Sequence, residues 1–152
     1  MIQRKQTLFL LIAVIAAVVC LCLPLGEFVS GNVMGGKSVV YNLWITRPDG
    51  SHDFSVWALF AILLVTCSIS LFAIFSYKNR IIQSRFCMFN ILLLLGWYFV
   101  LAAMTLKTDG AGGSFSISMT SALPAVSIIL HFMARKAILA DEALVRSADR
   151  IR

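Results

Sequence analysis

Charged residues are scarce in this chain, and four long stretches contain none at all. Asp, Glu, Lys and Arg make up 13% of the 152 residues, about half of their share in an ordinary globular domain. The uncharged stretches cover residues 8–25, 56–75, 86–106 and 115–134. As helices they would reach about 27–32 Å, close to the hydrocarbon thickness of a bilayer. A soluble domain of this length cannot bury so much continuous apolar surface, so the pattern predicts four membrane spans.

Cysteine is absent from every predicted loop. Cys20, Cys22, Cys67 and Cys87 all lie within the uncharged stretches, which excludes an outer disulfide framework and favours a packing role. Cys20 and Cys22 occupy the place where four-span thiol oxidases carry reactive cysteines. Those enzymes usually space the pair by two residues and carry a second pair, whereas here the spacing is one and no second outer pair exists. A membrane thiol oxidoreductase is therefore the weakest functional alternative.

Motifs for catalysis and ion coupling are missing too. The chain contains no metalloprotease helix, nucleophile elbow or phosphate loop. Carriers normally place a charged residue within their spans, and none is present here. His52 with Asp49 and Asp53 is a weak metal-binding pattern, because no second histidine lies in the outer loops. We therefore expect no enzymatic activity, no cofactor and no metal site.

The first outer loop, residues 26–55, is the most informative polar segment. Ser38–Ile45 is rich in β-branched and aromatic residues and is flanked by turn-forming glycines and a Pro-Asp-Gly sequence. This composition predicts a strand. We expect its partners around Phe28–Met34 and in the Gly113–Ser118 stretch. Phe115–Ser118 has a period of two, so it is either a short strand or the start of the fourth helix.

The four spans leave too few residues for a separate soluble core. We therefore predict a single membrane domain over residues 1–152. Its fold class is all-α integral membrane: a four-helix transmembrane bundle with a small extracytoplasmic β-hairpin or sheet in the first outer loop. A cytoplasmic helical tail over residues 135–152 follows the fourth span.

Basic residues are distributed unevenly around the predicted spans. Ten Lys and Arg residues lie before the first span, between the second and third, or after the fourth, and three lie on the opposite side. This bias predicts a cytoplasmic N-terminus and C-terminus, with residues 26–55 and 107–114 outside. We interpret the net charge of +6 as an orientation signal in a lipid bilayer and not as a nucleic-acid-binding surface. The first span is expected to be a retained helix, because no small-x-small cleavage pattern follows it.

Two polar side chains in the spans are candidates for an intramembrane site. Asn90 lies about one turn into the third stretch, and its amide is expected to bond a neighbouring helix. His131 lies near the inner end of the fourth stretch, where it would hydrogen-bond another helix or reach the headgroups. Pro124 removes a backbone donor and predicts a kink or a late helix start. A groove between spans near Pro124 and Asn90 is the predicted place for a lipid or hydrophobic ligand, the second functional hypothesis.

The tail over residues 135–152 has a helical pattern. Apolar residues recur at spacings of three and four, and Glu142 and Arg146 form an i,i+4 pair. The tail is predicted either to continue the fourth helix or to lie on the membrane surface. The apolar stripe consists of Ala137, Ala140, Leu144, Ala148 and Ile151.

The leading functional hypothesis is a non-enzymatic scaffold or accessory subunit that acts through contact with a membrane or cytoplasmic protein partner. It follows from the contrast between plain apolar spans and two polar-faced appendages. The sequence leaves the partner and the oligomeric state open. The candidate interaction residues are Leu144, Arg146, Ala148, Arg150 and Ile151 in the tail and Trp44 in the first outer loop.

Both ends of the chain resemble a known family. Met1–Leu8 and Asp141–Arg152 are similar to the ends of a family of short bacterial four-span membrane proteins, domain of unknown function 4293. The resemblance implies four spans in the bacterial cytoplasmic (inner) membrane and carries over no activity or functional residue. Tyr41–Trp44 in a β-rich first loop is also similar to the claudin-type layout, although that family's loop cysteines are absent here.

Overall fold

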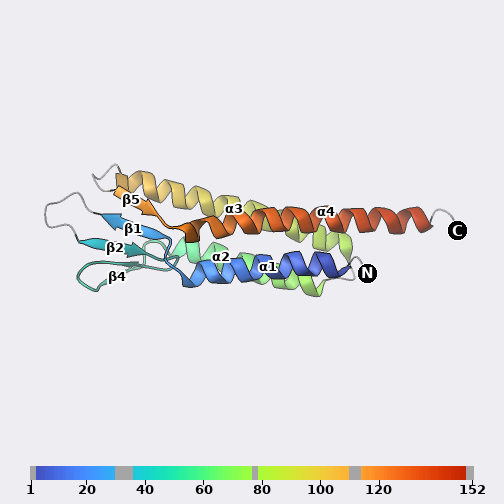
Figure 1. The fold of residues 1–152 in the computed structure, drawn as a ribbon, viewed down its shortest axis with the longest axis horizontal. Helices are drawn as coiled ribbons and strands as arrows, with labels where there is room; N and C mark the ends of the chain where they lie inside the picture. Colours follow the sequence, from blue (N-terminus) through green and yellow to red (C-terminus); the bar gives the residue numbers. More distant parts are fainter. Residues whose placement is uncertain (1–2, 30–35, 77–78, 110–113, 150–152) are drawn as a thin grey trace.

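The computed structural model describes residues 3–29, 36–76, 79–109 and 114–149. Within these residues, four α-helices run side by side along the long axis, and a small sheet lies at one end (Figure 1). We call this end the sheet end. At the opposite end, the tail end, the last helix extends past the others (Figure 1). The helices are α1 (Gln3–Cys22), α2 (Trp57–Phe75), α3 (Arg80–Asp109) and α4 (Leu123–Asp149).

The four helices form a bundle in which α1 and α3 each pack against both α2 and α4. Three segments are long and apolar enough to cross a membrane: Trp57–Phe75, Arg80–Lys107 and Met119–Ser147. Gln6–Cys22 is a shorter apolar helix. The predicted mostly helical fold with four helices and a small sheet is thereby confirmed, whereas the membrane crossing of each helix stays a prediction.

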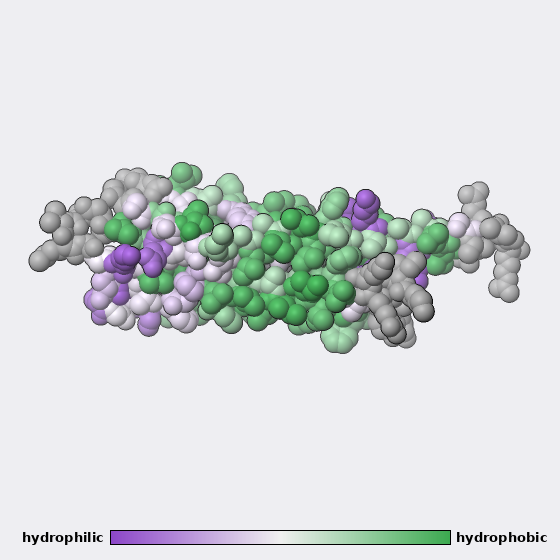
Figure 2. All heavy atoms as spheres, in the orientation of Figure 1, coloured by the Kyte–Doolittle hydropathy of each residue, from purple (hydrophilic) through white to green (hydrophobic). Residues whose placement is uncertain are grey.

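Large apolar side chains cover the outside of the bundle. Phe72, Phe75 and Phe99 are all well over half exposed. Apolar residues dominate the middle of the molecule, and polar residues gather toward its ends (Figure 2). Such a broad apolar surface is unfavourable in water and suits contact with lipid.

The sheet combines the two segments that the sequence suggested as strand partners. Its five antiparallel strands follow the order β4-β3-β2-β1-β5. β5 pairs with β1, so the segment between α3 and α4 joins the strands that lie between α1 and α2. The period-two stretch is therefore a strand. The strands are β1 (Gly26–Val29), β2 (Lys37–Val40), β3 (Ile45–Thr46), β4 (His52–Asp53) and β5 (Ser114–Ile117).

The prediction of one continuous strand over Ser38–Ile45 was wrong. The chain turns between β2 and β3, where the backbone N–H of Tyr41 donates to the carbonyl of Trp44 at 2.9 Å. Asn42 in this turn is buried and points into the bundle. Its amide Nδ2 donates to the carbonyl oxygen of Cys20 at 2.6 Å, and its Oδ1 accepts from the indole Nε1 of Trp97 at 3.2 Å. One side chain thus fixes the first loop to α1 and α3.

Several helix ends differ from the ends of the predicted spans. The fourth helix does not begin at residue 115, because β5 occupies that place and a short 3₁₀ helix, η1 (Met119–Ala122), follows it. Pro124 is the second residue of α4, where a missing backbone donor costs nothing. It therefore marks a late helix start and no kink.

Other helix ends also differ from the predicted spans: α1 ends earlier, whereas α3 and α4 extend further. α1 ends at Cys22, three residues before the predicted end of its span at Leu25. α3 runs from Arg80 to Asp109 and so exceeds the predicted stretch 86–106 at both ends. α4 continues without a break to Asp149, so the tail prolongs the fourth helix and does not lie separately on a surface.

Candidate functional site

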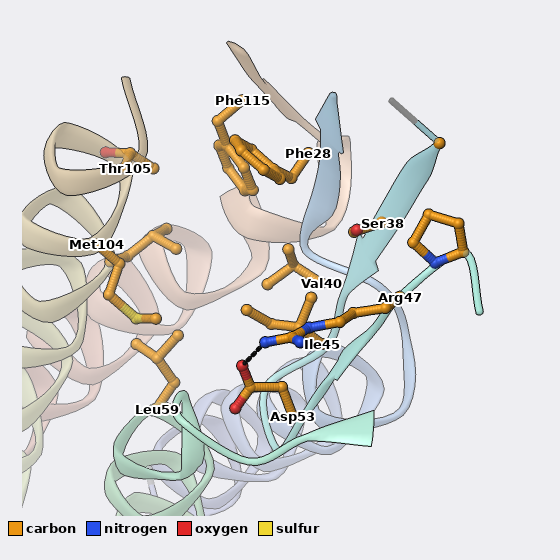
Figure 3. Close-up of a pocket in the computed structure, with 13 residues that line it drawn as sticks. Phe28, Ser38, Val40, Ile45, Arg47, Asp53, Leu59, Met104, Thr105 and Phe115 are labelled. Atoms are coloured by element: carbon orange, nitrogen blue, oxygen red, sulfur yellow. Dashed lines mark hydrogen bonds and ion pairs between the residues drawn. The ribbon is translucent and has the colours of Figure 1, made fainter. Parts of the chain in front are cut away.

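A pocket of about 310 Å³ lies between the sheet and the last turns of α3 (Figure 3). Its volume falls at the lower end of the range typical of small-molecule sites. Most of its lining is apolar. The lining residues include Phe28, Val40, Ile45, Leu59, Leu101, Met104 and Phe115, with Ser38, Arg47, Asp53 and Thr105 as polar members.

Alternation along the strands builds one wall of this pocket. Successive strand residues point to opposite faces of a sheet. Phe28 pairs directly with Ser38 on β2 and with Phe115 on β5, so these three side chains share the pocket face. Neighbouring strand positions, such as Glu27 and Thr46, belong to the opposite face. The sheet therefore has an apolar inner face and a polar outer face.

Gly26 allows the ring of Phe115 to lie close to β1. A Cβ atom at this position would come within 2.7 Å of the ring of Phe115 and would also clash with the backbone of β5. In Figure 3 the rings of Phe28 and Phe115 lie next to each other at the far end of the pocket from Leu59. The pocket therefore requires glycine at this position, because a side chain would displace the ring of Phe115.

The helices supply the other wall and the floor. Leu101, Met104 and Thr105 come from the part of α3 that reaches the sheet, and Leu59 comes from the first turn of α2. Leu59 and Leu101 also belong to the main apolar core of the bundle. The apolar lining of the pocket therefore adjoins the apolar core of the bundle.

An ion pair lies among the residues that line the pocket. Arg47 Nη2 donates to Asp53 Oδ2 at 2.8 Å, and both side chains are partly exposed. The backbone N–H of Ser55 donates to Asp53 Oδ1 at 3.0 Å. These contacts, that of Ser55 first, hold the pKa of Asp53 below its usual range. The pocket thus combines an apolar interior with one charged pair.

Trp44 lies on the turn after β2 and does not line the pocket. Its ring contacts those of Tyr41, His52 and Phe54, with centroid distances of 5.6–6.3 Å. This aromatic group stabilises the outer loop. A binding role for Trp44 stays a prediction.

The two predicted intramembrane polar residues, Asn90 and His131, meet in the bundle. Asn90 Nδ2 donates to Ser70 Oγ at 2.8 Å, and the same oxygen lies 3.1 Å from His131 Nε2. All three side chains are at most 1% exposed. They come from α2, α3 and α4, and we call them the polar cluster. The ring of His131 therefore bonds a neighbouring helix. The groove near Pro124 and Asn90 stays a prediction.

The tail residues are only partly described. Ala134, Ile138 and Asp141 are the buried positions of this part of α4, and Asp141 Oδ2 lies 3.1 Å from Nη1 of Arg80. Leu144 is 58% exposed, and Arg146 forms the expected pair with Glu142 at 3.1 Å. Arg150 and Ile151 lie outside the described residues, as does the side chain of Ala148.

The cysteines of the first span have different surroundings. Cys20 is buried beside Asn42, whereas Cys22 is exposed, and both are free thiols. Among the described residues, Cys67 and Cys87 are likewise free and buried.

Sequence reasoning missed three kinds of residue. Asn42 was assigned to a strand, although an amide in an otherwise apolar run is a signal of a buried hydrogen bond. Ser70 was not singled out. Asp53 was considered only as part of a weak metal-binding pattern, and its pairing with Arg47 depends on the register of β3 and β4, which no local pattern provides.

Comparison with known families and proteins gave one match. A search of the curated proteins found no match. The model of the family Domain of unknown function (DUF4293) matches residues 2–151. The chain therefore belongs to the DUF4293 family.

Proposed function

We propose that this protein is a non-enzymatic integral membrane protein that binds a lipid chain or another hydrophobic ligand in the pocket between the sheet and α3. The observation that carries the proposal is the pocket itself, because its apolar lining joins the apolar core of the bundle. We further propose four spans in a bacterial inner membrane, with both termini in the cytoplasm and the sheet outside. The basic residues around the spans support this orientation.

The size of the pocket favours one chain over a whole lipid. A volume of about 310 Å³ corresponds to about ten water-sized groups at about 30 Å³ each. One alkyl chain segment or one compact ring system fills such a space. Burial of apolar ligand surface then contributes about 25 cal/mol per Å².

A pair of adjacent substitutions on β2 tests the proposal. Ser38 lines the pocket, and Val39 belongs to the opposite face of the same strand. Ser38→Trp is expected to fill the pocket and to reduce retention of a ten-carbon alkyl ligand at least tenfold. Val39→Trp adds the same ring outside the pocket and is expected to leave retention unchanged.

Retention is measured by native mass spectrometry of the purified protein in detergent, after incubation with the alkyl ligand. Thermal unfolding of both variants establishes that they are folded. Absence of any retained ligand on the unsubstituted protein, or equal loss in both variants, contradicts the pocket as a ligand site.

A second candidate function is contact with a protein partner through the tail. The exposed Leu144 and Val145 at the tail end favour it, because α4 extends there past the other helices (Figure 1). Arg146 lies beside this apolar pair on the helix surface.

The tail is tested without disturbing the bundle by removing residues 144–152 only. This deletion keeps Ile138 and the Arg80–Asp141 ion pair. A photo-crosslinker at position 139, which lies before the deletion, is expected to capture a specific partner in the intact chain and to lose it in the truncated chain. An unchanged set of cross-linked proteins contradicts the tail as the contact surface.

A further inference from the structure

The polar cluster has a defined hydrogen-bond pattern. The hydroxyl of Ser70 has one proton, which it donates to the carbonyl of Thr66 at 2.8 Å. The amide of Asn90 donates to the same hydroxyl oxygen. Because the oxygen then has one lone pair left, His131 Nε2 donates to it. The imidazole is therefore protonated at Nε2 and carries a free lone pair at Nδ1.

Two acceptor atoms remain in this cluster. Asn90 Oδ1 and His131 Nδ1 are fully buried, and no partner for either exists within the described part of the chain. Buried polar atoms in native proteins are nearly always hydrogen-bonded, since desolvation of an unpaired acceptor is unfavourable. Each of these two acceptor atoms requires a hydrogen-bond donor.

The surroundings favour a neutral ligand over a cation. The nearest titratable or charged side chains along the same helices are Cys67, Cys87 and Arg135, three to four residues from the cluster. No described carboxylate lies within this distance in sequence, and the guanidinium of Arg135 disfavours a second positive charge. A water molecule has two donors and needs little space. We propose that Asn90 Oδ1 and His131 Nδ1 bind a single water molecule inside the bundle.

The bound water itself is detected by NMR on the intact chain with ¹⁵N-labelled histidine. We expect magnetisation transfer from water to the imidazole of His131 and a ¹⁵N shift at Nδ1 typical of a hydrogen-bond acceptor. Asn90→Leu is expected to remove the transfer. Absence of the transfer in the unsubstituted protein, with an unbonded Nδ1 shift, would overturn the proposal.

Discussion

Two buried asparagines, Asn42 and Asn90, differ in how many of their amide atoms are hydrogen-bonded. Asn42 at the sheet end uses both ends of its amide, because it donates to Cys20 and accepts from Trp97. Asn90 in the polar cluster donates to Ser70, but its Oδ1 has no partner in the described part of the protein. Both side chains are 0% exposed. An amide with both ends hydrogen-bonded holds parts of the fold together. An amide whose oxygen has no partner indicates a place where a ligand can donate a hydrogen bond.

Removal of Asn42 should have the largest effect. Asn42→Leu leaves the indole N–H of Trp97 and the carbonyl of Cys20 without their partner, so we expect the free energy of unfolding to fall by about 3 kcal/mol. Equilibrium unfolding in detergent measures this loss. Asn42→Leu with Trp97→Phe removes both sides of one bond and should recover part of the stability. A loss below that of Asn90→Leu would break the comparison.

A methyl group at Gly26 tests the tight fit of the sheet end. Gly26→Ala forces the ring of Phe115 and the β5 backbone away from β1, at an expected cost of about 2 kcal/mol and with weaker ligand retention. Gly96→Ala is the control, because a Cβ at that helical position meets no atom within 4 Å among the described residues. The control should be neutral or should stabilise the helix slightly. Thermal unfolding of the two variants compares them directly, and equal losses would show that the fit at Gly26 is unimportant.

Asn90 should be easier to replace than Asn42. Asn90→Leu removes an unpaired acceptor together with one hydrogen bond, so the expected loss is about 1 kcal/mol, within the range measured for polar contacts between membrane helices. The same unfolding assay applies. Ser70→Ala is the matched variant, since it removes the shared oxygen but keeps the amide. A loss of about 3 kcal/mol in Asn90→Leu would mean that this residue contributes as much to the free energy of unfolding as Asn42 does.

Acid should destabilise the sheet end slightly. The pKa of Asp49 is lowered by hydrogen bonds from Ser51, and that of Asp53 by Ser55 and Arg47. Carboxyl groups with a lowered pKa stabilise the folded state above their unfolded pKa of about 3.9, and this contribution disappears as the pH falls through the folded value. Fluorescence of Trp44 in a protein with Trp57 and Trp97 replaced by Phe should change below about pH 4. Asp53→Asn should reduce that change, and an identical acid response in this variant would contradict the role of the ion pair.

Secondary structure could be predicted from the sequence where a local pattern of residue types determines it. The lack of charge placed four helices, and the period of two at Phe115–Ser118 indicated a strand. The third predicted stretch ended before Lys107 and Asp109 because these residues are charged. The helix nevertheless includes them, since the part of a helix outside a membrane needs no apolar residues. The strand over Ser38–Ile45 was drawn too long because the inward turn at Asn42 depends on partners 22 and 55 residues away.

The polar cluster and the pocket also differ in how far the sequence predicts them. Asn90 and His131 could be found from the sequence, since polar residues in apolar spans are few. Their shared partner Ser70 could not be singled out, because serine in a membrane helix commonly bonds its own backbone. The pocket depends on the pairing of β1 with β5, which only the assembled bundle brings together.

The pairing of Gly26 with Ile117 also has a consequence for biogenesis. The second and third helices lie between these residues in the chain, so β5 cannot pair with β1 until both helices have been synthesised. Closure of the sheet is then a late step in folding. A nascent chain arrested before residue 114 should expose the aromatic face of β1 to proteases or chaperones.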